Sequence, residues 1–345
     1  MSKKTVNVAV AGLGFMGVTH LRAYQQHRHA RIVAVCDPRR SPVNGMLAGV
    51  NGNIGDSSGL QLGRGVKVYR EFSELLADEN VELVDICTPT VFHPSQVAAA
   101  MQARKHVLCE KPLAQNVGEA RKMLAAINGA KNFLMPAMCM RFWPGWAEMK
   151  KVVAEKTYGA VRAANFRRVS ARPAWSRHGV HLGGALYDLH IHDTDFVSYL
   201  FGRPQKVFST GVQDAHGNID HVVTQYLYPA GPTVHAEGSW LHAEGFNMSF
   251  TLTCERATIE FDLARGIQAL QLTPVRKLQK VLKLKGTDGY AGEIGYFVDC
   301  VRRGIKPTVV TAQDSVTTLE ILRAEERSVR TGKPVAVQQS NANQL

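Results

Sequence analysis

Apolar runs and helical patterns alternate along the first part of the chain. The runs are rich in β-branched residues and predict strands at residues 6–11, 32–36, 66–69, 83–87 and 106–108. Between them, apolar residues recur three or four positions apart, which predicts helices at residues 18–27, 74–77, 95–103 and 117–127. Strands that alternate with helices are typical of right-handed βαβ units. We therefore predict a doubly wound parallel sheet in an N-terminal domain of residues 1–134.

The pattern changes in the second part of the chain. Helices are predicted at residues 145–155 and 184–201, with a strand at 161–169 between them. Strands follow at residues 206–212, 222–228, 233–240, 249–253 and 258–262, and then helices at 294–303 and 312–330. Such a series of strands favours an antiparallel sheet with one packed and one exposed face. Residues 135–345 are therefore predicted to form a second, α/β domain.

Residues 41–65 interrupt the first domain. Asn44-Gly45, Gly59 and Gly63-Arg64-Gly65 make this stretch too rich in glycine for one continuous helix. We predict a partly helical loop insertion here.

Composition limits the class of protein. The chain has 345 residues, of which 45% are hydrophobic and 20% charged, enough for two domains with a core and too apolar for a disordered chain. The sequence has no signal-peptide pattern and no apolar run long enough to span a membrane, so we expect a soluble, cytoplasmic protein. Six cysteines are spread singly, which favours reduced thiols over disulfides or a zinc site. We therefore expect no bound metal.

The charge is strongly basic. Lysine and arginine number 41 against 29 aspartate and glutamate residues, a net charge of +12, which favours anionic partners. The basic residues are mostly scattered pairs without interleaved aromatic residues, so we expect no nucleic-acid binding. An anionic cofactor or substrate, or simply a solvated basic face, accounts for the charge.

A glycine motif follows the first predicted strand at the start of a helix. Gly12, Gly14 and Gly17 form the pattern G-x-G-x-x-G, and Phe15 and Met16 lie inside it. The first glycine permits a tight turn, the second lets the backbone approach a diphosphate, and the third allows close packing of the helix. The free N–H groups and the dipole of the helix N-terminus attract the diphosphate. We expect these five residues to bind a dinucleotide.

Asp37 ends the second predicted strand, twenty residues after Gly17. A carboxylate at this position binds the hydroxyl groups of the adenosine ribose and favours NAD. Arg39 leaves NADP open, because a guanidinium here can bind the 2′-phosphate. The alternative without a ligand is an aspartate that caps the following turn.

Two later loops follow strands at the edge of the sheet where the nicotinamide would lie. One carries Thr88, Pro89 and His93, and the other carries Glu110 and Lys111. The proline that follows Lys111 disfavours helical backbone and extends the turn, so the lysine side chain can point toward a ligand. We expect all five residues to contact the cofactor.

A third group lies in the second domain. On a helix, the spacing of Asp188, His192 and Asp195 places them on one face, where a carboxylate can orient an imidazole for proton transfer. The alternatives are a solvated acidic face or a metal site of His190, His192 and Asp195. Because His190 and His192 lie on different faces of a helix, the metal site is disfavoured.

Polar and aromatic residues precede this helix: Arg141, Trp143, Trp175, Arg177 and His178. Aromatic faces stack on the C–H groups of sugars, so these residues are candidates for a sugar pocket, and ordinary packing is the alternative.

These motifs, in this order, resemble the Gfo/Idh/MocA family, named for glucose-fructose oxidoreductase and inositol dehydrogenase. The resemblance covers nearly the whole chain and rests on the glycine motif, Thr88-Pro89, Glu110-Lys111-Pro112, Arg141-Phe142, and Gly183-Gly184 followed by Asp188 and His192. It implies a Rossmann domain, then an α/β domain whose open sheet often forms a homo-oligomer, a dimer or tetramer. Thr90 departs from the family, where asparagine is common, and residues 41–65 are longer than usual.

The resemblance also implies a reaction. The family oxidises a ring hydroxyl of a sugar or cyclitol with a nicotinamide cofactor, or reduces the carbonyl. Its catalytic residues correspond to Lys111, Asp188 and His192, with His192 as the base; these three, with Arg141 and Trp175, would bind the substrate. The alternatives are a redox-neutral NAD-dependent glycosidase and a non-catalytic nicotinamide sensor.

Overall fold

The computed structural model describes residues 5–50, 52, 58–173, 183–286 and 288–338, and the chain divides into two compact units. The first unit comprises Met1–Trp143 and Thr287–Val316, and the second comprises Pro144–Gly286 and Thr317–Leu345. The first unit therefore includes a segment from near the end of the sequence.

The first unit is built on a parallel sheet of six strands. They are β1 (Val6–Ala11), β2 (Ala30–Cys36), β5 (Lys67–Tyr69), β6 (Leu83–Ile86), β7 (His106–Cys109) and β8 (Leu134–Pro136). Their order is β5-β2-β1-β6-β7-β8, and every neighbouring pair is parallel. The predicted doubly wound sheet is confirmed. In this topology ligands bind at the carboxyl ends of the strands, beside β1, where the strand order reverses.

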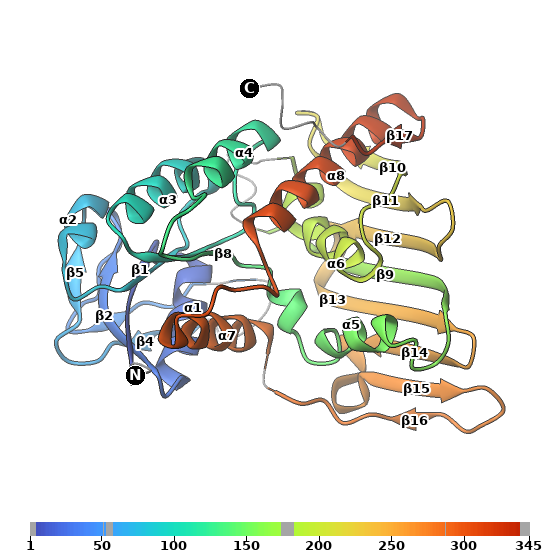
Figure 1. Ribbon diagram of the computed structural model, residues 1–345, viewed down its shortest axis with the longest axis horizontal. Helices are drawn as coiled ribbons and strands as arrows, with labels where there is room; N and C mark the ends of the chain where they lie inside the picture. Colours follow the sequence, from blue (N-terminus) through green and yellow to red (C-terminus); the bar gives the residue numbers. More distant parts are fainter. Residues whose placement is uncertain (1–4, 51, 53–57, 174–182, 287, 339–345) are drawn as a thin grey trace. The chain divides into compact units, whose positions relative to one another are not determined.

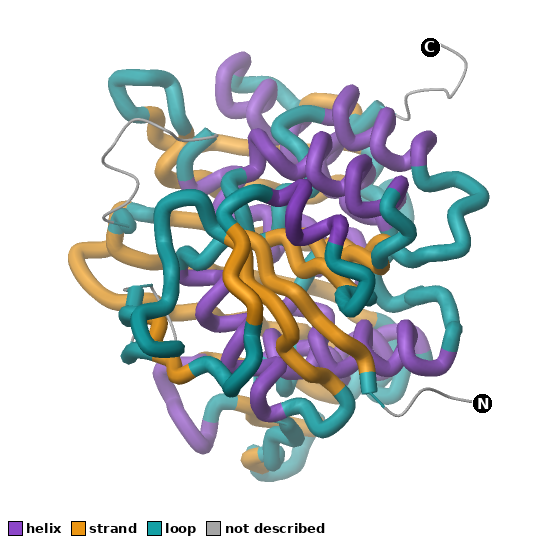
Figure 2. Tube along the Cα trace, turned by 90° about the vertical axis from the view of Figure 1, so that its left-hand side faces the viewer, coloured by secondary structure: helices purple, strands orange, loops and turns teal. Residues whose placement is uncertain are grey.

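Helices flank this sheet on both faces (Figures 1 and 2). They are α1 (Phe15–Gln26), α2 (Phe72–Ala77), α3 (His93–Gln102), α4 (Val117–Ala126) and α7 (Gly289–Arg303), with short 3-10 turns at Thr90–Phe92 and Cys139–Phe142. Helix α7 packs beside α1 and β1. The cover on both faces explains why β6 is buried along its whole length.

The insertion at residues 41–65 is a hairpin in its described part. Strands β3 (Met46–Leu47) and β4 (Leu60–Gln61) pair antiparallel. The predicted partial helix is wrong for the described residues, where Asn44 and Gly45 take positive φ angles of 51° and 77°. Such a pair favours a tight reversal of the chain rather than a helix.

The second unit is built on a sheet of nine strands. They are β9 (Val161–Ala171), β10 (Lys206–Gln213), β11 (Ile219–Leu227), β12 (Thr233–Ser239), β13 (Leu241–Cys254), β14 (Ala257–Asp262), β15 (Leu270–Pro274), β16 (Lys280–Val281) and β17 (Val335–Ala336). Their order is β16-β15-β14-β13-β9-β12-β11-β10-β17. Only β9 and β12 pair in parallel within this sheet. The predicted open, mostly antiparallel sheet is confirmed.

Helical segments of the second unit pack on one face of its sheet (Figure 1). They include α5 (Ala147–Ala154), a π-helical turn at Leu186–His190 that continues into α6 (Ile191–Phe201), and the later part of α8 (Ala312–Thr331). Trp146 is fully buried between helix and sheet, with the rings of Phe196 and Phe250 at centroid distances of 5.1 and 5.0 Å. A 3-10 turn, Leu263–Gln268, links β14 to β15.

None of the helices in the described part of the chain is long and apolar enough to cross a lipid bilayer.

Candidate active site

The glycine motif forms a turn between β1 and α1 that leaves room for a ligand. Gly12 has a φ of +90°, and a Cβ there would lie 2.5 Å from the carbonyl oxygen of Cys87. A Cβ on Gly17 would lie 1.9 Å from the carbonyl oxygen of Gly12. Around Gly14, by contrast, there is no described atom within 4 Å of such a Cβ. The backbone is therefore tightly packed at the first and third glycines and open at the second.

Helix α1 begins without a cap. Gly14 is its N-cap residue and has no side chain that could bond to the N–H groups of the first turn, which holds no acidic residue. Within the part of the chain that the structure describes, no side chain bonds to the N–H groups of Phe15 and Met16, so these groups can bind an anion beside the open backbone of Gly14. The uncapped N-terminus and the open glycine fit a dinucleotide diphosphate.

Asp37 connects the glycine turn to the end of β2. Its Oδ2 accepts a hydrogen bond from Leu13 N at 2.8 Å, and its Oδ1 accepts from Arg39 N at 2.8 Å and Arg40 N at 2.9 Å. The carboxylate is thus fixed beside the glycine turn, Gly12 to Gly17, and the start of α1, which together we call the cradle. The side chain of Arg39 is exposed, whereas the guanidinium of Arg40 donates to the carbonyl oxygens of Leu13 and Ala48.

The inserted hairpin lies along α1. A Cβ on Gly52 would lie only 2.0 Å from the Phe15 ring, so residue 52 packs against the cradle. Further along the helix, Gln25 donates to the carbonyl oxygen of Gln61 at 2.6 Å, and Arg22 donates to the Ser58 hydroxyl at 3.0 Å. The insertion therefore covers one side of the helix whose N-terminus forms the cradle.

The loops after β6 and β7 are tied together by His93. Its Nε2 lies 2.8 Å from the carbonyl oxygen of Thr88, and its Nδ1 lies 2.9 Å from that of Pro112. Burial lowers the pKa of His93, although both carbonyls raise it. His93 is 1% exposed, and its buried ring bridges the two loops through these carbonyls. Thr88 bonds through its hydroxyl to the side chain of Gln96 at 2.5 Å.

Glu110 also points inward. It is 7% exposed, and its Oε2 accepts a hydrogen bond from Lys111 N at 2.9 Å. Its Oε1 lies 3.2 Å from His20 Nε2, and His20 Nδ1 lies 2.8 Å from Asp85 Oδ2. Lys111 is half-buried. The sequence predicts a role for Glu110 and Lys111 but not for His20 and Asp85, which lie next to Glu110. The signal that indicates them is Asp85, a charged residue inside an apolar strand.

In the second unit, Asp188 and His192 lie at the junction of the π-helical turn and α6. Both are half-buried. Asp195 is 1% exposed and accepts a hydrogen bond from the Thr318 hydroxyl at 3.2 Å. His192 and Asp195 keep the predicted three-residue spacing within α6, whereas Asp188 precedes His192 across the π-helical turn. The π-helical turn at 186–190 has more residues per turn than an α-helix, so a constant α-helical spacing does not hold across it.

A buried polar network supports this junction. His190 is fully buried, with Nε2 at 3.3 Å from the Tyr226 hydroxyl and 3.5 Å from Glu325 Oε2. Arg168 donates to both carboxylate oxygens of Asp193, at 2.8 and 3.1 Å. His190 is thus buried and His192 is only half-buried, as expected for residues on different faces.

The remaining predicted substrate residues are Arg141 and Trp175. Arg141 is buried in the first unit, where it donates to the carbonyl oxygen of Val309 at 2.7 Å and pairs with Asp314 at 3.2 Å. Trp175 lies outside the described residues, as do Arg177 and His178.

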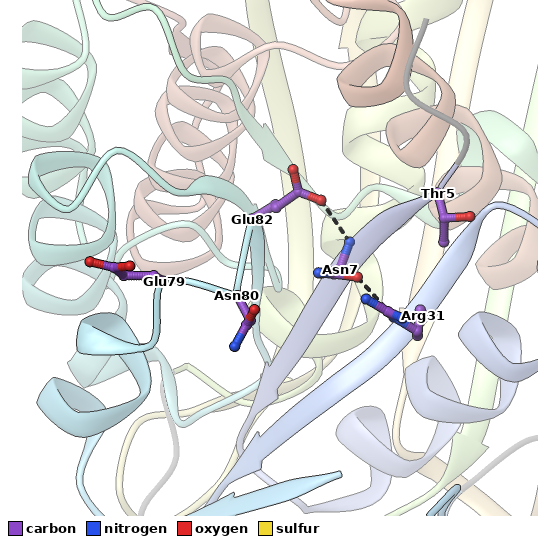
Figure 3. Close-up of a pocket in the computed structure, with 6 residues that line it drawn as sticks. All are labelled: Thr5, Asn7, Arg31, Glu79, Asn80 and Glu82. Carbon is purple, nitrogen blue, oxygen red and sulfur yellow. Dashed lines mark hydrogen bonds between the residues drawn. The ribbon is translucent and has the colours of Figure 1, made fainter. Parts of the chain in front are cut away.

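A polar hollow of about 460 Å³ opens elsewhere on the first unit (Figure 3). Its residues are Thr5, Asn7, Arg31, Glu79, Asn80 and Glu82. It lies at the amino ends of β1, β2 and β6, opposite the strand ends where sheets of this topology bind cofactors. We therefore place the candidate site at the glycine turn and not in this hollow.

Two family models match the sequence. One, described as "Oxidoreductase family, NAD-binding Rossmann fold", matches residues 6–138, and the other, described as "GFO/IDH/MocA C-terminal domain", matches residues 146–260. These matches confirm the predicted NAD-binding Rossmann fold and the predicted oxidoreductase class.

Known proteins resemble the chain to different extents. A trans-1,2-dihydrobenzene-1,2-diol dehydrogenase of Sus scrofa is 36% identical over 169 residues, 48% of this chain and 50% of that relative, so the match spans about half the relative's length. A myo-inositol 2-dehydrogenase of Thermotoga maritima is 24% identical over 346 residues, 97% of this chain and 99% of the relative. Among solved structures, levoglucosan dehydrogenase in complex with NADH and L-sorbose has a TM-score of 0.82 at 19% identity, covering 98% of this chain and 100% of that chain. This last likeness shows the shared fold.

Proposed function

The chain belongs to the Gfo/Idh/MocA family of oxidoreductases, and we propose that it is an NAD-dependent dehydrogenase of a cyclic polyol, a sugar or a cyclitol. The observation that carries this proposal is the cradle: an uncapped helix N-terminus beside the open backbone of Gly14, with Asp37 fixed at its edge. Each part has a partner in a dinucleotide, the diphosphate for the helix and the ribose for the carboxylate.

NAD is the preferred cofactor in this proposal. Asp37 already accepts three backbone hydrogen bonds, which hold its charge at the place where NADP carries its additional phosphate. Like charges repel, so the carboxylate disfavours NADP. Arg39 is the exposed cation on the same turn and is the residue that would favour NADP.

The chemistry divides between cofactor and chain. Nicotinamide, when bound, accepts or returns the hydride. We assign three residues to the reacting hydroxyl: His192 takes its proton, Lys111 stabilises the developing negative charge on its oxygen, and Asp188 orients His192 or binds a neighbouring hydroxyl. Arg141 and Trp175 remain proposed substrate residues.

The relatives suggest the class of substrate. They are named for a dihydrodiol, for myo-inositol and for levoglucosan, all of them cyclic compounds with hydroxyl groups. A cyclic polyol is therefore the substrate class that we propose.

We also propose that the protein is a cytoplasmic homo-oligomer. None of the six cysteines, all of them within the described residues, forms a disulfide, and five of them are buried, which suits a reducing compartment. The face of the nine-stranded sheet opposite its helices is the surface proposed for self-association, a dimer or tetramer. Light scattering coupled to size-exclusion chromatography tests the oligomeric state directly.

The function is tested by absorbance at 340 nm. Purified protein is mixed with NAD⁺ or NADP⁺ and, in turn, levoglucosan, myo-inositol, aldoses and sugar acids. Growth of absorbance with NAD⁺ and one class of cyclic polyol is the expected result. A flat trace across the panel, from protein that still binds NADH by fluorescence, would contradict the dehydrogenase assignment. Hydrolysis of a chromogenic glycoside without added cofactor would identify a redox-neutral enzyme in its place.

A further inference from the structure

A buried polar cluster lies behind the loops after β6 and β7 in the first unit. His20 on α1 is its centre and is completely buried. Asp85 from β6 is also completely buried, and its Oδ2 is 2.8 Å from His20 Nδ1. Glu110 faces the other ring nitrogen at 3.2 Å, and Glu293 from α7 lies 3.9 Å from that same nitrogen. Cys87 Sγ lies 3.5 Å from His20 Nδ1. One imidazole thus faces three carboxyl groups and a thiol.

The positions of the two ring nitrogens indicate the charge on His20. A neutral imidazole has one N–H and one lone pair. If Nδ1 carries the hydrogen, the lone pair of Nε2 faces Glu110; if Nε2 carries it, the lone pair of Nδ1 faces Asp85. Only the imidazolium has an N–H on both nitrogens: Nδ1 hydrogen-bonds to Asp85, and Nε2 faces Glu110 at ion-pair distance without a hydrogen bond among the described residues, so the arrangement suits a cation between two anions.

The electrostatics of the neighbouring acids agree with this. Burial favours a neutral ring, but Asp85 raises the pKa of His20 well above its ordinary value. Burial alone would raise the pKa of Glu110, yet His20 and Lys111 lower it. Burial raises the pKa of Glu293 well above its usual range, and its two carboxyl oxygens have no hydrogen-bond partner among the described residues. Burial therefore favours the neutral form of Glu293, next to the ion pairs that His20 makes with Asp85 and Glu110.

Lys111 and Asp288 also act on the cluster through their charges, Lys111 on Glu110 and Asp288 on Glu293, and the remaining groups around it are neutral. Burial raises the pKa of Cys87, of Tyr24 on α1 and of Tyr290 on α7, which keeps the thiol and both phenols protonated. Tyr290 lies beside His20 with ring centroids 6.2 Å apart. Among the described groups with a resolved shift, none competes with His20 for the positive charge.

Glu110 links this charge to the proposed catalytic loop. One of its oxygens faces His20, and the other accepts the hydrogen bond from the backbone of Lys111 at 2.9 Å. Rotation of this carboxylate would break the hydrogen bond from Lys111 N or separate Oε1 from the His20 ring. The peptide of Lys111 is therefore linked to His20 on α1 through the single side chain of Glu110.

We propose that His20 is a positioning residue: as a buried cation it joins Asp85 to Glu110, and through Glu110 it fixes the backbone that carries Lys111. The positioning role rests on the proposed function, in which Lys111 stabilises charge on the reacting oxygen. The charge on His20 and its link to the Lys111 peptide are properties of the fold and do not depend on that function.

The charge is tested by ¹⁵N NMR of the full-length protein labelled at histidine. Comparison with the spectrum of His20→Asn identifies the signals of His20. The expected result is a ring with two protonated nitrogens that does not titrate between pH 6 and pH 9. A neutral ring, or a titration near pH 6.5, would overturn the proposal. Zinc in stoichiometric amount in the wild-type protein, lost in His20→Asn, would overturn it too, because the metal would then occupy the space between His20, Asp85 and Cys87.

The link to Lys111 is tested by hydrogen exchange of the peptide that spans residues 106–114. In His20→Asn and in Glu110→Gln, exchange at the Lys111 amide should quicken about tenfold or more, because the hydrogen bond to a fixed charged partner is weakened. The double variant should exchange no faster than Glu110→Gln alone, since both changes act on one linkage. Additive effects, or wild-type exchange in His20→Asn, would refute the linkage.

Controls separate positioning from loss of fold. His216→Asn makes the same substitution at an exposed site of the second unit and should leave exchange at residues 106–114 unchanged. If His20→Asn does not fold, His20→Gln replaces it both for identifying the NMR signals of His20 and for the exchange measurement. Turnover should fall in His20→Asn at unchanged NADH affinity. Normal turnover in Lys111→Ala with intact linkage would remove the catalytic role of Lys111 and leave the linkage standing.

Discussion

Replacement of Asp37 by asparagine offers a sharp test of cofactor choice. The carboxylate accepts from Leu13 N on one oxygen and from Arg39 N and Arg40 N on the other, at 2.8 to 2.9 Å. Asparagine keeps one oxygen for the two N–H groups of the turn, and its NH₂ group then faces Leu13 N–H, a donor against a donor. The variant thus loses one charge-assisted bond in the cradle and its negative charge together.

The magnitude follows from these losses. A hydrogen bond to a charged group contributes about 1.5–3 kcal/mol. Loss of the charged hydrogen bond between Asp37 and the adenosine ribose should therefore weaken NADH binding by roughly 10- to 150-fold. Removal of the charge relieves repulsion of the 2′-phosphate, so NADPH should bind as well as before or better. The ratio of the NADPH Kd to the NADH Kd should therefore fall at least about tenfold.

The assay is fluorescence titration of NADH and of NADPH against wild type and Asp37→Asn, with unfolding midpoints measured alongside. Glu79→Gln is the matched control, because it removes the same charge at an exposed position beside the hollow of Figure 3, at the other end of the strands. It should leave the ratio unchanged. A ratio in folded Asp37→Asn within twofold of the wild-type value would refute the role given to Asp37.

Three further predictions follow from the same geometry. Lys111→Ala should lower turnover about a hundredfold or more, as loss of an electrostatic stabiliser does, while the NADH Kd changes less than about threefold; steady-state kinetics and fluorescence titration measure the two. Gly17→Ala should lower both the unfolding midpoint and NADH affinity, because its Cβ would lie 1.9 Å from the Gly12 carbonyl oxygen; a wild-type melting curve would exclude that clash. Glu293 has a raised pKa when folded, so folding keeps a proton that the unfolded chain releases above about pH 4.5, and stability should decline as pH rises from there. Between pH 5.5 and 7.5 the free energy of unfolding of the wild type should therefore fall more steeply than that of Glu293→Gln, by up to about 1.4 kcal/mol per pH unit, and equal slopes in denaturant titrations would contradict this.

The fold follows closely from the hydrophobic pattern because most elements bury one clear face. The run at residues 6–11 is the strand β1 without adjustment, and the strand predicted at 83–87 is β6 at 83–86. Strand β8 escaped prediction because it has only three residues and ends in a proline, Pro136. The hairpin at residues 46–61 also escaped, since two-residue strands carry no readable alternation.

The candidate site was predictable where motifs are local and not where partners are distant. The glycine turn and Asp37 lie within one short stretch of sequence, which runs through a strand, a turn, a helix and a second strand. His20, Asp85 and Glu293 come from three elements up to 273 positions apart, and no spacing rule joins them. The π-helical turn before His192 was equally hidden, because a single extra residue in a turn leaves no mark on the apolar pattern.

Charges inside apolar segments nevertheless carry information, because a buried charge without a partner costs several kcal/mol. Asp85 interrupts an apolar strand in the first unit, and its partner is His20. In the second unit Arg168 and Asp193, 3% and 0% exposed at their side chains, are joined by two hydrogen bonds.

Each pair lies close to a residue to which we assign a catalytic role. Glu110 connects His20 to Lys111, and Asp193 is next to His192 in the sequence. Such pairs contribute little net stability compared with apolar packing, and their main effect is to restrict how the adjoining backbone can move. A reaction that depends on angstrom-scale placement of a lysine and a histidine gains from that restriction, which explains why charge is buried in these two places although hydrophobic residues would pack there at lower cost.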